Sequence, residues 1–395
     1  MTQPDPPESL GVGRQFEIYR AGLGGHQPTQ AIALEELEQQ AKQVLSTEAY
    51  DYLAGGAGAE DTMRANLAAF RRWRLIPRML RNVSRRSLSV DLLGHRLPAP
   101  ILLAPIGVQS ILHRQAEVAV ARAASSLGIP IVLSTVSSKP LEEVAAAMGP
   151  VPHWFQLYWP SHAELAASLL KRAERSGYSA IVVTLDTFLL AWRERDLQNA
   201  YLPFLLGEGL ANYFSDPVYR AALRAPPEND PAAAIQYFAK VFSNSALTWE
   251  DLPFLRRHTR LPILLKGILH PGDAQRALDC GVSGIIVSNH GGRQVDGAVA
   301  ALDALPQVVD RVGGQVPVLF DSGIRRGSDV LKALALGAQA VLLGRPYCYG
   351  LAAAGEFGVR EVLKNLLADL DLTLGLIGCS TPAELHRDQL VASPP

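Results

Sequence analysis

A histidine and an arginine three residues apart are the first residues of this chain whose types and spacing could support chemistry. They belong to the segment Ser288-Asn289-His290-Gly291-Gly292-Arg293-Gln294. The segment follows Gly284–Val287, a short apolar run typical of a buried parallel strand. His290 could act as a base and Arg293 as an anion-binding fork, and the two glycines between them would permit a tight turn. A lone histidine is more often structural, but other predicted strand ends carry matching signals.

Two further segments with glycine and arginine follow later apolar runs. One is Asp321-Ser322-Gly323-Ile324-Arg325, and the other is Gly344-Arg345. The loops after the seventh and eighth strands of α/β barrels commonly bind a phosphate through glycine N–H groups and a helix N-terminus. Arg325 and Arg345 could add charge-assisted hydrogen bonds. These segments therefore predict a phosphorylated cofactor or substrate.

Other predicted strand ends add a cation and a carboxylate. Lys266 ends an apolar run, which is costly unless an anion pairs with it; a purely structural ion pair is the alternative. Asp186 follows another run and could fix a catalytic imidazole, as in hydrolase triads. No serine or cysteine has the surroundings of an activated nucleophile. The set favours proton removal from a substrate that carries a carboxylate, with Lys266 beside an anion that develops on the cofactor.

Eight strand candidates alternate with helical stretches, which indicates a parallel sheet with crossover helices. We expect an α/β fold, a (β/α)8 TIM barrel with an N-terminal helical extension, rather than an open doubly wound sheet, because no G-x-G-x-x-G follows the first strand. The candidates are Ala99–Ile106, Pro130–Ser134, His153–Tyr158, Ala180–Asp186, Pro262–Gly267, Gly284–Asn289, Val316–Asp321 and Ala340–Gly344.

The remaining chain is assigned around this barrel. Residues 1–30 are rich in Pro, Gly and Gln and predict a surface arm, and residues 31–395 predict one barrel domain. Ile32–Leu53 has a helical pattern, and residues 75–97 read as irregular chain with a small hairpin. Residues 187–248 are far longer than a connection after the fourth strand needs, which predicts a lid over the site.

The composition limits the classes of partner. The 395 residues carry a net charge of −1, which gives no electrostatic basis for binding nucleic acid or an acidic membrane. The three cysteines have no metal-ligand spacing and make no disulfide framework, so we expect no metal site and a reducing, cytoplasmic environment. No apolar run reaches the length of a membrane span, and the N-terminus lacks a secretion signal.

These motifs resemble those of the FMN-dependent 2-hydroxy acid oxidase and dehydrogenase family, which includes glycolate oxidase, lactate oxidase and flavocytochrome b2. The similarity runs from Ile32 to Leu385, and Ser288–Gln294 is its most specific string. The resemblance implies FMN as the cofactor and a small 2-hydroxy acid as the substrate. It also implies a homo-oligomer, a tetramer or octamer.

The resemblance assigns roles to individual residues. His290 corresponds to the base and Asp186 to its partner, while Lys266 corresponds to the lysine at the N1–O2 edge of the flavin. The residues implied for the substrate are Tyr52, Tyr158, Arg193, His290 and Arg293. Those implied for FMN are Pro105, Ile106, Gly107, Ser134, Gln156, Thr184, Lys266, Ser288, Asp321, Gly323, Arg325, Gly344 and Arg345.

Within the family the chain is most similar to the lactate 2-monooxygenases, through stretches such as Ala104–Val108 and Thr248–Asp251. This implies oxidation of an L-2-hydroxy acid with O2 as acceptor and release of a decarboxylated acid. The alternatives are a simple oxidase that releases 2-keto acid and H2O2, a dehydrogenase with another acceptor, and a redox-neutral FMN-barrel isomerase. A non-enzymatic binding scaffold is the least favoured. Gly107 stands where many relatives have alanine, which predicts room for a bulkier acid.

Overall fold

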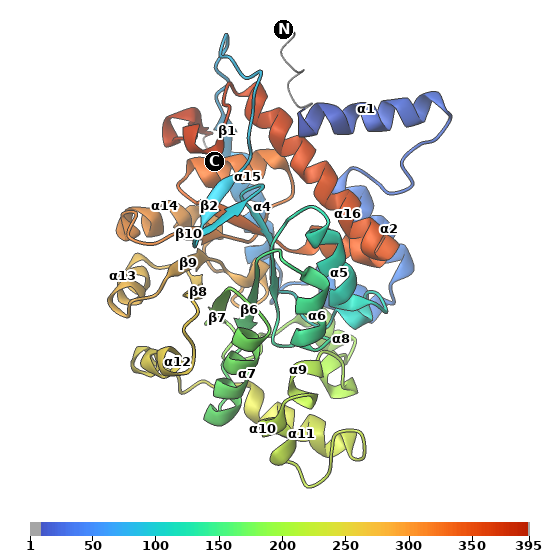
Figure 1. Cartoon of the computed structure of the whole chain (residues 1–395), viewed down its shortest axis with the longest axis vertical. Helices are drawn as coiled ribbons and strands as arrows, with labels where there is room; N and C mark the ends of the chain where they lie inside the picture. The colour runs from blue at the N-terminus through green and yellow to red at the C-terminus, as the bar shows by residue number, and fades with distance from the viewer. Residues whose placement is uncertain (1–8, 394–395) are drawn as a thin grey trace.

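A closed barrel of eight parallel strands forms the centre of the molecule (Figure 1). The computed structural model describes residues 9–393. Around the barrel the strands are ordered β10-β11-β4-β5-β6-β7-β8-β9. Their bounds are β4 Ile101–Leu103, β5 Ile131–Leu133, β6 His153–Leu157, β7 Ala180–Thr184, β8 Ile263–Ile268, β9 Gly284–Val287, β10 Val318–Phe320 and β11 Ala340–Leu343. All eight predicted strands are present, and the predicted TIM barrel is confirmed.

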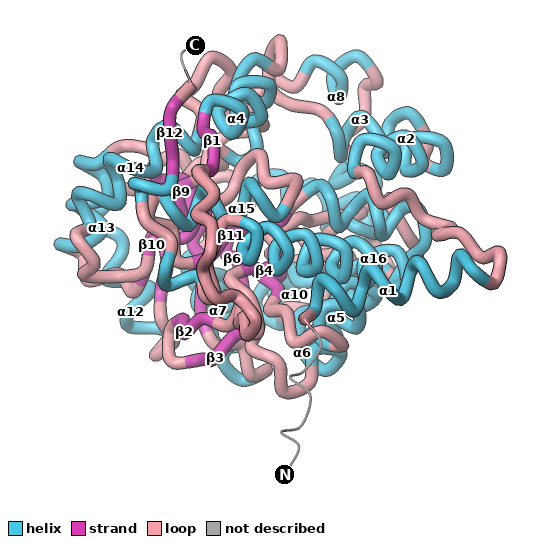
Figure 2. The backbone as a smooth tube through the Cα atoms, turned by 90° about the horizontal axis from the view of Figure 1, so that it is seen from above, coloured by secondary structure: helices cyan, strands magenta, loops and turns pink. Residues whose placement is uncertain are grey.

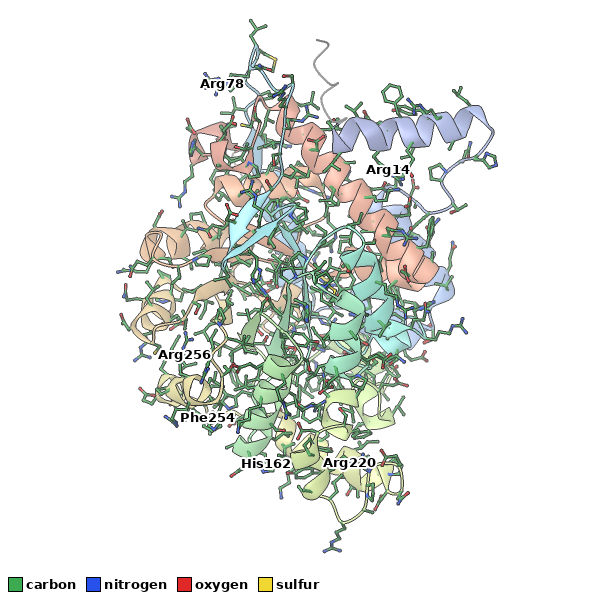
Figure 3. The ribbon with its side chains drawn as sticks, in the orientation of Figure 1. Arg14, Arg78, His162, Arg220, Phe254 and Arg256 are labelled. Atoms are coloured by element: carbon green, nitrogen blue, oxygen red, sulfur yellow. The ribbon has the colours of Figure 1, made fainter. Side chains whose placement is uncertain are left out.

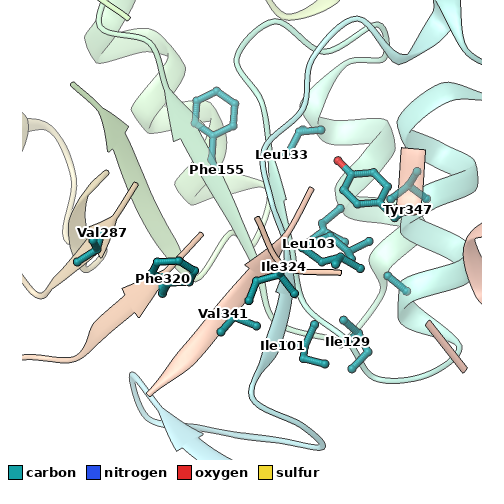
Figure 4. Close-up of a cluster of buried hydrophobic side chains, with 14 of the residues drawn as sticks. Ile101, Leu103, Ile129, Leu133, Phe155, Val287, Phe320, Ile324, Val341 and Tyr347 are labelled. Carbon is teal, nitrogen blue, oxygen red and sulfur yellow. The ribbon is translucent and has the colours of Figure 1, made fainter. Parts of the chain in front are cut away.

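Alternation along each strand divides the core into two layers. Leu102 and its equivalents on the other strands, such as Val182 and Ile286, fill the interior of the barrel. Leu92 and Leu97 join this cluster from the hairpin of β2 (Val90–Leu92) and β3 (His95–Leu97). The neighbouring side chains, among them Leu103, Phe155 and Val341 in Figure 4, belong to a second cluster that they share with the helices. Strands buried on both faces explain why the sequence has continuous apolar runs there.

Helices surround the strands on the outside (Figure 2). Most follow the strands as crossovers: α5 Ala116–Ser125, α6 Leu141–Met148, α7 Ala163–Arg175, α12 Leu252–His258, α13 Pro271–Asp279, α14 Ala301–Val312 and α15 Gly327–Ala335. The last, α16 (Arg345–Leu376), is interrupted at Ala354 and Gly355. It packs against α5, α15 and the N-terminal helices. Among residues 9–393, no helix is both long and apolar enough to cross a membrane.

The N-terminal region that was expected to form an arm contains a helix. Residues Leu10–Leu23 form helix α1, whose first part packs against α16 (Figure 1). Gly11 allows the close approach, because a Cβ there would lie 2.4 Å from the Leu372 side chain, and its N–H donates to Asp371 Oδ2 over 2.9 Å. Residues 1–8 lie outside the described part. The helical pattern of Ile32–Leu53 is two helices, α2 (Leu34–Val44) and α3 (Thr47–Ala54), since Ser46 caps the second by accepting from the Ala49 N–H.

Residues 187–248, the long segment, lie between β7 and β8 and contain several short helices. These are α8 Glu194–Gln198, η2 Pro203–Leu206, α9 Ala211–Phe214, α10 Pro217–Ala221 and α11 Pro231–Phe242. Arg220 of α10 lies at the opposite end of the molecule from Arg14 of α1 (Figure 3). An aromatic cluster holds the segment together through Phe204, Tyr213, Tyr219, Phe238 and Phe242. Before α8, in contrast, Phe188 is 51% exposed and Trp192 is 72% exposed.

A small antiparallel sheet closes the chain. It pairs β1 (Trp73–Leu75) with β12 (Leu390–Ala392), which lie side by side in Figure 2. The α4 helix (Asp61–Arg72) leads into β1. Neither strand was predicted, because three residues are too few to show a periodic pattern.

Candidate functional site

A pocket lies at the carboxyl ends of the barrel strands. The strand ends, helix α3 and the long segment all contribute to its wall. Most of the residues singled out in the sequence line it together: Tyr52, Pro105, Ile106, Gly107, Tyr158, Arg193, Lys266, His290, Arg293, Asp321, Gly323, Arg325, Gly344 and Arg345. Residues from distant parts of the sequence therefore meet in one cavity.

Five of the predicted residues do not line this pocket. Ser134 and Gln156 are buried at the ends of β5 and β6, where the Ser134 hydroxyl donates to Gln156 Oε1 over 3.1 Å. Thr184, Asp186 and Ser288 line a second cavity, which shares Tyr158, Thr187 and Phe242 with the main pocket. Asp186 reaches the main pocket only through its neighbours. We therefore place these five behind the pocket surface.

His290 and Asp186 form a largely buried pair, whose side chains are 16% and 13% exposed. The Nδ1 atom of His290 lies 2.8 Å from Asp186 Oδ1, and its Nε2 atom lies 3.5 Å from the Tyr158 hydroxyl. Burial lowers the pKa of His290, with Lys266 and Arg193 adding to the effect, although Asp186 opposes it. Burial raises the pKa of Asp186, but His290 and Lys266 outweigh this and lower it to about 2. The imidazole is thus neutral at pH 7 with an ionised carboxylate on Nδ1, so Nε2 is free to accept a proton.

The backbone at His290 is strained. Its φ is 59°, in the left-handed region that is uncommon for residues other than glycine. Asn289 holds the turn by accepting from the Gly292 N–H over 3.1 Å, and the Ser288 hydroxyl accepts from the His290 N–H over 3.0 Å. A Cβ at Gly292 would lie 2.6 Å from the Met63 backbone, so this position requires glycine. Such strain is typical of functional turns.

Lys266 is a buried cation on the barrel side of the pocket. Its ammonium lies 3.1 Å from Asp321 Oδ2 and donates to the Ser288 hydroxyl over 2.9 Å. Burial lowers its pKa, but Asp321 and Asp186 outweigh this and the net direction is upward. Lys266 therefore stays protonated, and its charge faces the same space as His290.

Four arginines, Arg193, Arg293, Arg325 and Arg345, give the pocket a strongly positive wall. Arg293 donates to the Gly55 carbonyl over 2.8 Å and lies over the Tyr52 ring, 5.2 Å from its centroid. Burial, then Arg193 and Arg345, lowers the pKa of Arg293 to about 9, so its guanidinium remains charged at neutral pH. Arg193 donates to the Arg293 carbonyl over 3.2 Å. Buried cations gathered in this way favour an anionic ligand such as a carboxylate.

The end of the pocket that suits a phosphate combines the N-terminus of α16 with Arg345. Gly344 is the N-cap of α16 and has no side-chain cap, which leaves N–H groups of the first turn for a ligand. Arg345 lies directly on this turn and donates to the carbonyls of Leu53, Gly55 and Gly291. The N-terminus of α15 differs, because Asp329 already accepts from Arg325 N and Arg326 N over 3.0 Å. The α16 end is thus the better anion site.

The remaining donors suit a flat heterocycle. Gln156 Nε2 is buried and has no hydrogen-bond partner among the described residues, which indicates a polar group still to be bound. Lys266 offers a cation on the same side of the barrel, and the Pro105–Gly107 backbone lines the opposite wall. Open space surrounds Gly344, whose Cβ would approach nothing closer than 3.7 Å. The set fits a phosphorylated flavin.

Gly107 does not open space as expected. A Cβ there would lie 2.5 Å from Val136 Cγ2 and 2.6 Å from the Val136 carbonyl oxygen. Val108 N donates to that same oxygen over 2.9 Å. The two loops after β4 and β5 therefore close against each other, and Val136 fills the space that the missing methyl leaves.

Several pocket residues were not singled out from the sequence as site residues. Thr187 lines both cavities and bonds to the His290–Asp186 pair; its position directly after Asp186 is the signal that could have found it. Apolar wall residues come from the long segment and the loops after β4 and β5: Val108, Ile111, Leu112, Val136, Leu190, Phe204 and Phe242. Their apolar character is ordinary in a barrel, so no sequence signal marks them.

Comparisons with known proteins identify the family of this chain. The chain matches the family model described as FMN-dependent dehydrogenase over residues 41–392. It is 47% identical to the FMN-dependent alpha-hydroxy acid dehydrogenase qulF of Penicillium citrinum, covering 97% of this chain and 96% of the relative. It is 44% identical to an L-lactate oxidase of Lysinibacillus sphaericus, covering 91% and 92%.

A solved structure supports the same assignment. The crystal structure of mandelate oxidase with (S)-4-hydroxymandelic acid matches with a TM-score of 0.83 and 42% identity, over 92% of this chain and 99% of that chain. These likenesses extend over nearly the whole fold. The chain belongs to the family of FMN-dependent 2-hydroxy acid dehydrogenases and oxidases, with FMN as its cofactor.

Proposed function

We propose that this enzyme oxidises an L-2-hydroxy acid at the α-carbon with O2 as acceptor, and releases the 2-keto acid and H2O2. The observation that carries the proposal is the shared pocket: the His290–Asp186 pair opens into the same cavity as Arg293 and Tyr52. A base and a carboxylate-binding group in one cavity match the two functional groups of a 2-hydroxy acid. The names of the relatives, among them L-lactate oxidase, favour this oxidase over the monooxygenase expected from the sequence.

The substrate carboxylate would bind at the arginine wall. Arg293 offers a planar fork of N–H donors, and Tyr52 can donate from its hydroxyl. Arg193 adds a second positive charge. This arrangement would hold the α-carbon and its hydroxyl beside His290 and Tyr158, which are 3.5 Å apart through Nε2 and the hydroxyl. Fixing the reacting groups in this way lowers the entropic cost of reaction.

His290 Nε2 would accept the hydroxyl proton of the substrate. FMN, when bound, supplies the two-electron acceptor for the hydrogen that leaves the α-carbon. Asp186 stabilises the imidazolium that forms, and the positive charge of Lys266 stabilises negative charge on the cofactor. Burial of all three groups strengthens these interactions relative to water. His290, Asp186, Tyr158 and Lys266 are the residues that we assign to catalysis.

We assign the cofactor to the barrel side of the pocket. Its phosphate would lie at the α16 N-terminus, held by Gly344 and Arg345 with Arg325 and Gly323 nearby. The ring would lie along Pro105–Gly107, with Gln156, Ser134 and Thr184 behind it and Lys266, Ser288 and Asp321 on the other edge. Gln156 Nε2, which has no hydrogen-bond partner within residues 9–393, supports this orientation.

A monooxygenase outcome, in which acetate and CO2 replace pyruvate and peroxide, is the second candidate. The buried aromatic cluster of the long segment supports it, because Phe204 and Phe242 line the pocket and could slow product release. The exposed Phe188 and Trp192 count against a closed lid.

Product analysis in air separates these outcomes. Purified enzyme with FMN is incubated with L-lactate, L-mandelate or glycolate, without catalase. Stoichiometric 2-keto acid and H2O2 are expected. Acetate and CO2 from L-lactate with little peroxide would instead support the monooxygenase, and no reduction of FMN by any of the acids would reject the proposed function.

The assembly and location are also part of the proposal. The exposed apolar face of α1, with Phe16, Tyr19 and Leu23, supports a homo-oligomer. A cytoplasmic location stays a prediction from the sequence. Light scattering of the purified protein tests the oligomer: a mass of a single 42.6 kDa chain would reject it.

A further inference from the structure

Thr187 contacts both members of the His290–Asp186 pair. Its hydroxyl donates to Asp186 Oδ1 over 3.1 Å and lies 3.2 Å from His290 Nδ1. Thr187 is 7% exposed and lines both the main pocket and the cavity behind it. It therefore stands at the junction of the two cavities, where a change in its side chain would reach the catalytic pair directly.

The number of available protons determines which atoms donate and which accept around Thr187. A threonine hydroxyl has one proton, which goes to the carboxylate. Because the carboxylate is ionised, His290 Nδ1 must carry a proton, and this N–H is shared between Asp186 Oδ1 at 2.8 Å and Thr187 Oγ1 at 3.2 Å. The neutral ring then has its lone pair on Nε2, toward Tyr158.

Asp186 has few further contacts to hold it. Its Oδ2 atom is buried without a partner among the described residues. Its side chain is therefore held through Oδ1 alone, by His290 and Thr187. The bond from Gln294 reaches only the backbone carbonyl of Asp186. Without the threonine hydroxyl, the carboxylate could rotate about its remaining bond and carry the imidazole with it.

We propose that Thr187 is a positioning residue that orients the His290–Asp186 pair and keeps His290 in the tautomer with Nε2 free for the substrate. Thr187 acts through Asp186 and His290 and makes no bond to the substrate itself. The inference rests on the proposed function, because it concerns the proton-accepting step.

The variant Thr187→Val tests this, because it removes the hydroxyl and keeps the shape. Flavin reduction by the best 2-hydroxy acid is followed under nitrogen in the FMN-loaded enzyme, over a range of substrate concentrations. The limiting rate constant should fall by about 10- to 100-fold, as expected when a reacting group is misplaced. The substrate dissociation constant should change little, because Arg293 and Tyr52 are untouched. Thr187→Ser should restore most of the rate.

Thr259→Val is the matched control. Thr259 is 6% exposed, and its hydroxyl donates to Glu174 Oε2 over 2.8 Å, in the loop that precedes β8. It should lose a comparable buried hydrogen bond without any change in the rate of flavin reduction.

A double variant shows whether the effect passes through Asp186. In the Asp186→Asn background, Thr187→Val should change the reduction rate by no more than about 2-fold, because residues in one network are not additive. A wild-type rate in Thr187→Val, or no recovery in Thr187→Ser, overturns the inference while the proposed function stands. If no 2-hydroxy acid reduces the wild-type flavin, both are overturned.

Discussion

The Nδ1 atom of His290 and the Oδ1 atom of Asp186 are 2.8 Å apart, although the two residues are 104 positions apart in the sequence. Parallel strands β7 and β9 bring them together, because the carboxyl ends of all eight strands meet at one edge of the barrel. The short distance couples an ionised carboxylate to a neutral imidazole inside a buried site. This pairing is the basis for the first two predictions.

Replacing His290 by Gln should remove flavin reduction while leaving the cofactor bound. Glutamine keeps a polar side chain of similar size but accepts no proton at neutral pH. Loss of a positioned base commonly costs about 10²–10⁴-fold. Anaerobic reduction by L-lactate, followed by the bleaching of the flavin, measures the rate, and the absorption spectrum reports the bound FMN. Reduction at nearly the wild-type rate would remove His290 from its role.

The pH dependence should place the acid limb of kcat/KM below pH 6.5. His290 must be neutral to accept a proton, and its pKa is lowered by burial, so the active form is present above that pKa and is lost as the pH falls through it. Asp186, with a pKa of about 2, remains ionised across this range. Initial rates between pH 5 and 8 at low substrate concentration test this. An acid limb centred above pH 7 would contradict the neutral imidazole.

Replacing Arg293 by Lys should reduce activity although the charge is kept. Lysine cannot form the planar two-donor contact with a carboxylate, and it would lose the bond to the Gly55 carbonyl. A charge-assisted hydrogen bond is worth about 1.5–3 kcal/mol, so kcat/KM should fall by at least about 10-fold. Methyl lactate, which lacks the carboxylate, should be a poor substrate of the wild type. Equal turnover of ester and acid would exclude carboxylate recognition at this wall.

Replacing Arg345 by Met should weaken FMN binding. Methionine keeps the length of the side chain and removes the charge beside the α16 N-terminus. Loss of a charge-assisted contact corresponds to about 1.5–3 kcal/mol, or roughly 10- to 100-fold in Kd. Arg220→Met, on an exposed ion pair with Glu228 outside the pocket, is the control. Fluorescence titration of apoprotein with FMN measures both, and an unchanged Kd in Arg345→Met would move the phosphate elsewhere.

The barrel could be predicted from the sequence because its strands are buried on both faces. Continuous apolar runs such as Ile263–Leu265 are typical of parallel strands when they alternate with helical stretches. The chemistry could be predicted because polar residues at the ends of such runs, Lys266 and His290 among them, are costly without a function. These signals are local. The carboxyl ends of parallel strands meet at one edge of a barrel, so the residues that carry the signals come together there.

What the sequence did not reveal depends on contacts between distant segments. Helix α1, which lies within the expected arm, was not predicted, since its stability comes from packing on α16 rather than from its own pattern. The β1–β12 pair joins the two ends of the domain. Thr187 follows Asp186 directly in the sequence, but only the fold brings its hydroxyl to His290 Nδ1. Gly107 suggested space, but Val136 from another loop occupies it.

The contact between Gly107 and Val136 predicts which residue limits the size of the substrate. Val136 lines the pocket, and its Cγ2 atom occupies the space beside Gly107. Shortening it by Val136→Ala should enlarge the pocket and raise kcat/KM for L-mandelate relative to L-lactate. One methylene in an apolar pocket is worth about 1–3 kcal/mol, so a change of about 10-fold or more is expected. An unchanged ratio of the two kcat/KM values would show that Val136 does not limit substrate size.

Gly107→Ala should overpack the contact with Val136 and destabilise the protein. The new methyl would lie 2.5 Å from Val136 Cγ2 and 2.6 Å from the Val136 carbonyl oxygen, and the backbone atom cannot rotate away. Overpacking of this kind costs about 1–3 kcal/mol, so the melting temperature should fall. Adding Val136→Ala should recover only part of the loss, because it relieves the side-chain contact and leaves the carbonyl in place. Full recovery of the melting temperature in the double variant would show that the Val136 side chain alone sets the spacing of these two loops. An unchanged melting temperature in Gly107→Ala would show that the loops are not closed against each other.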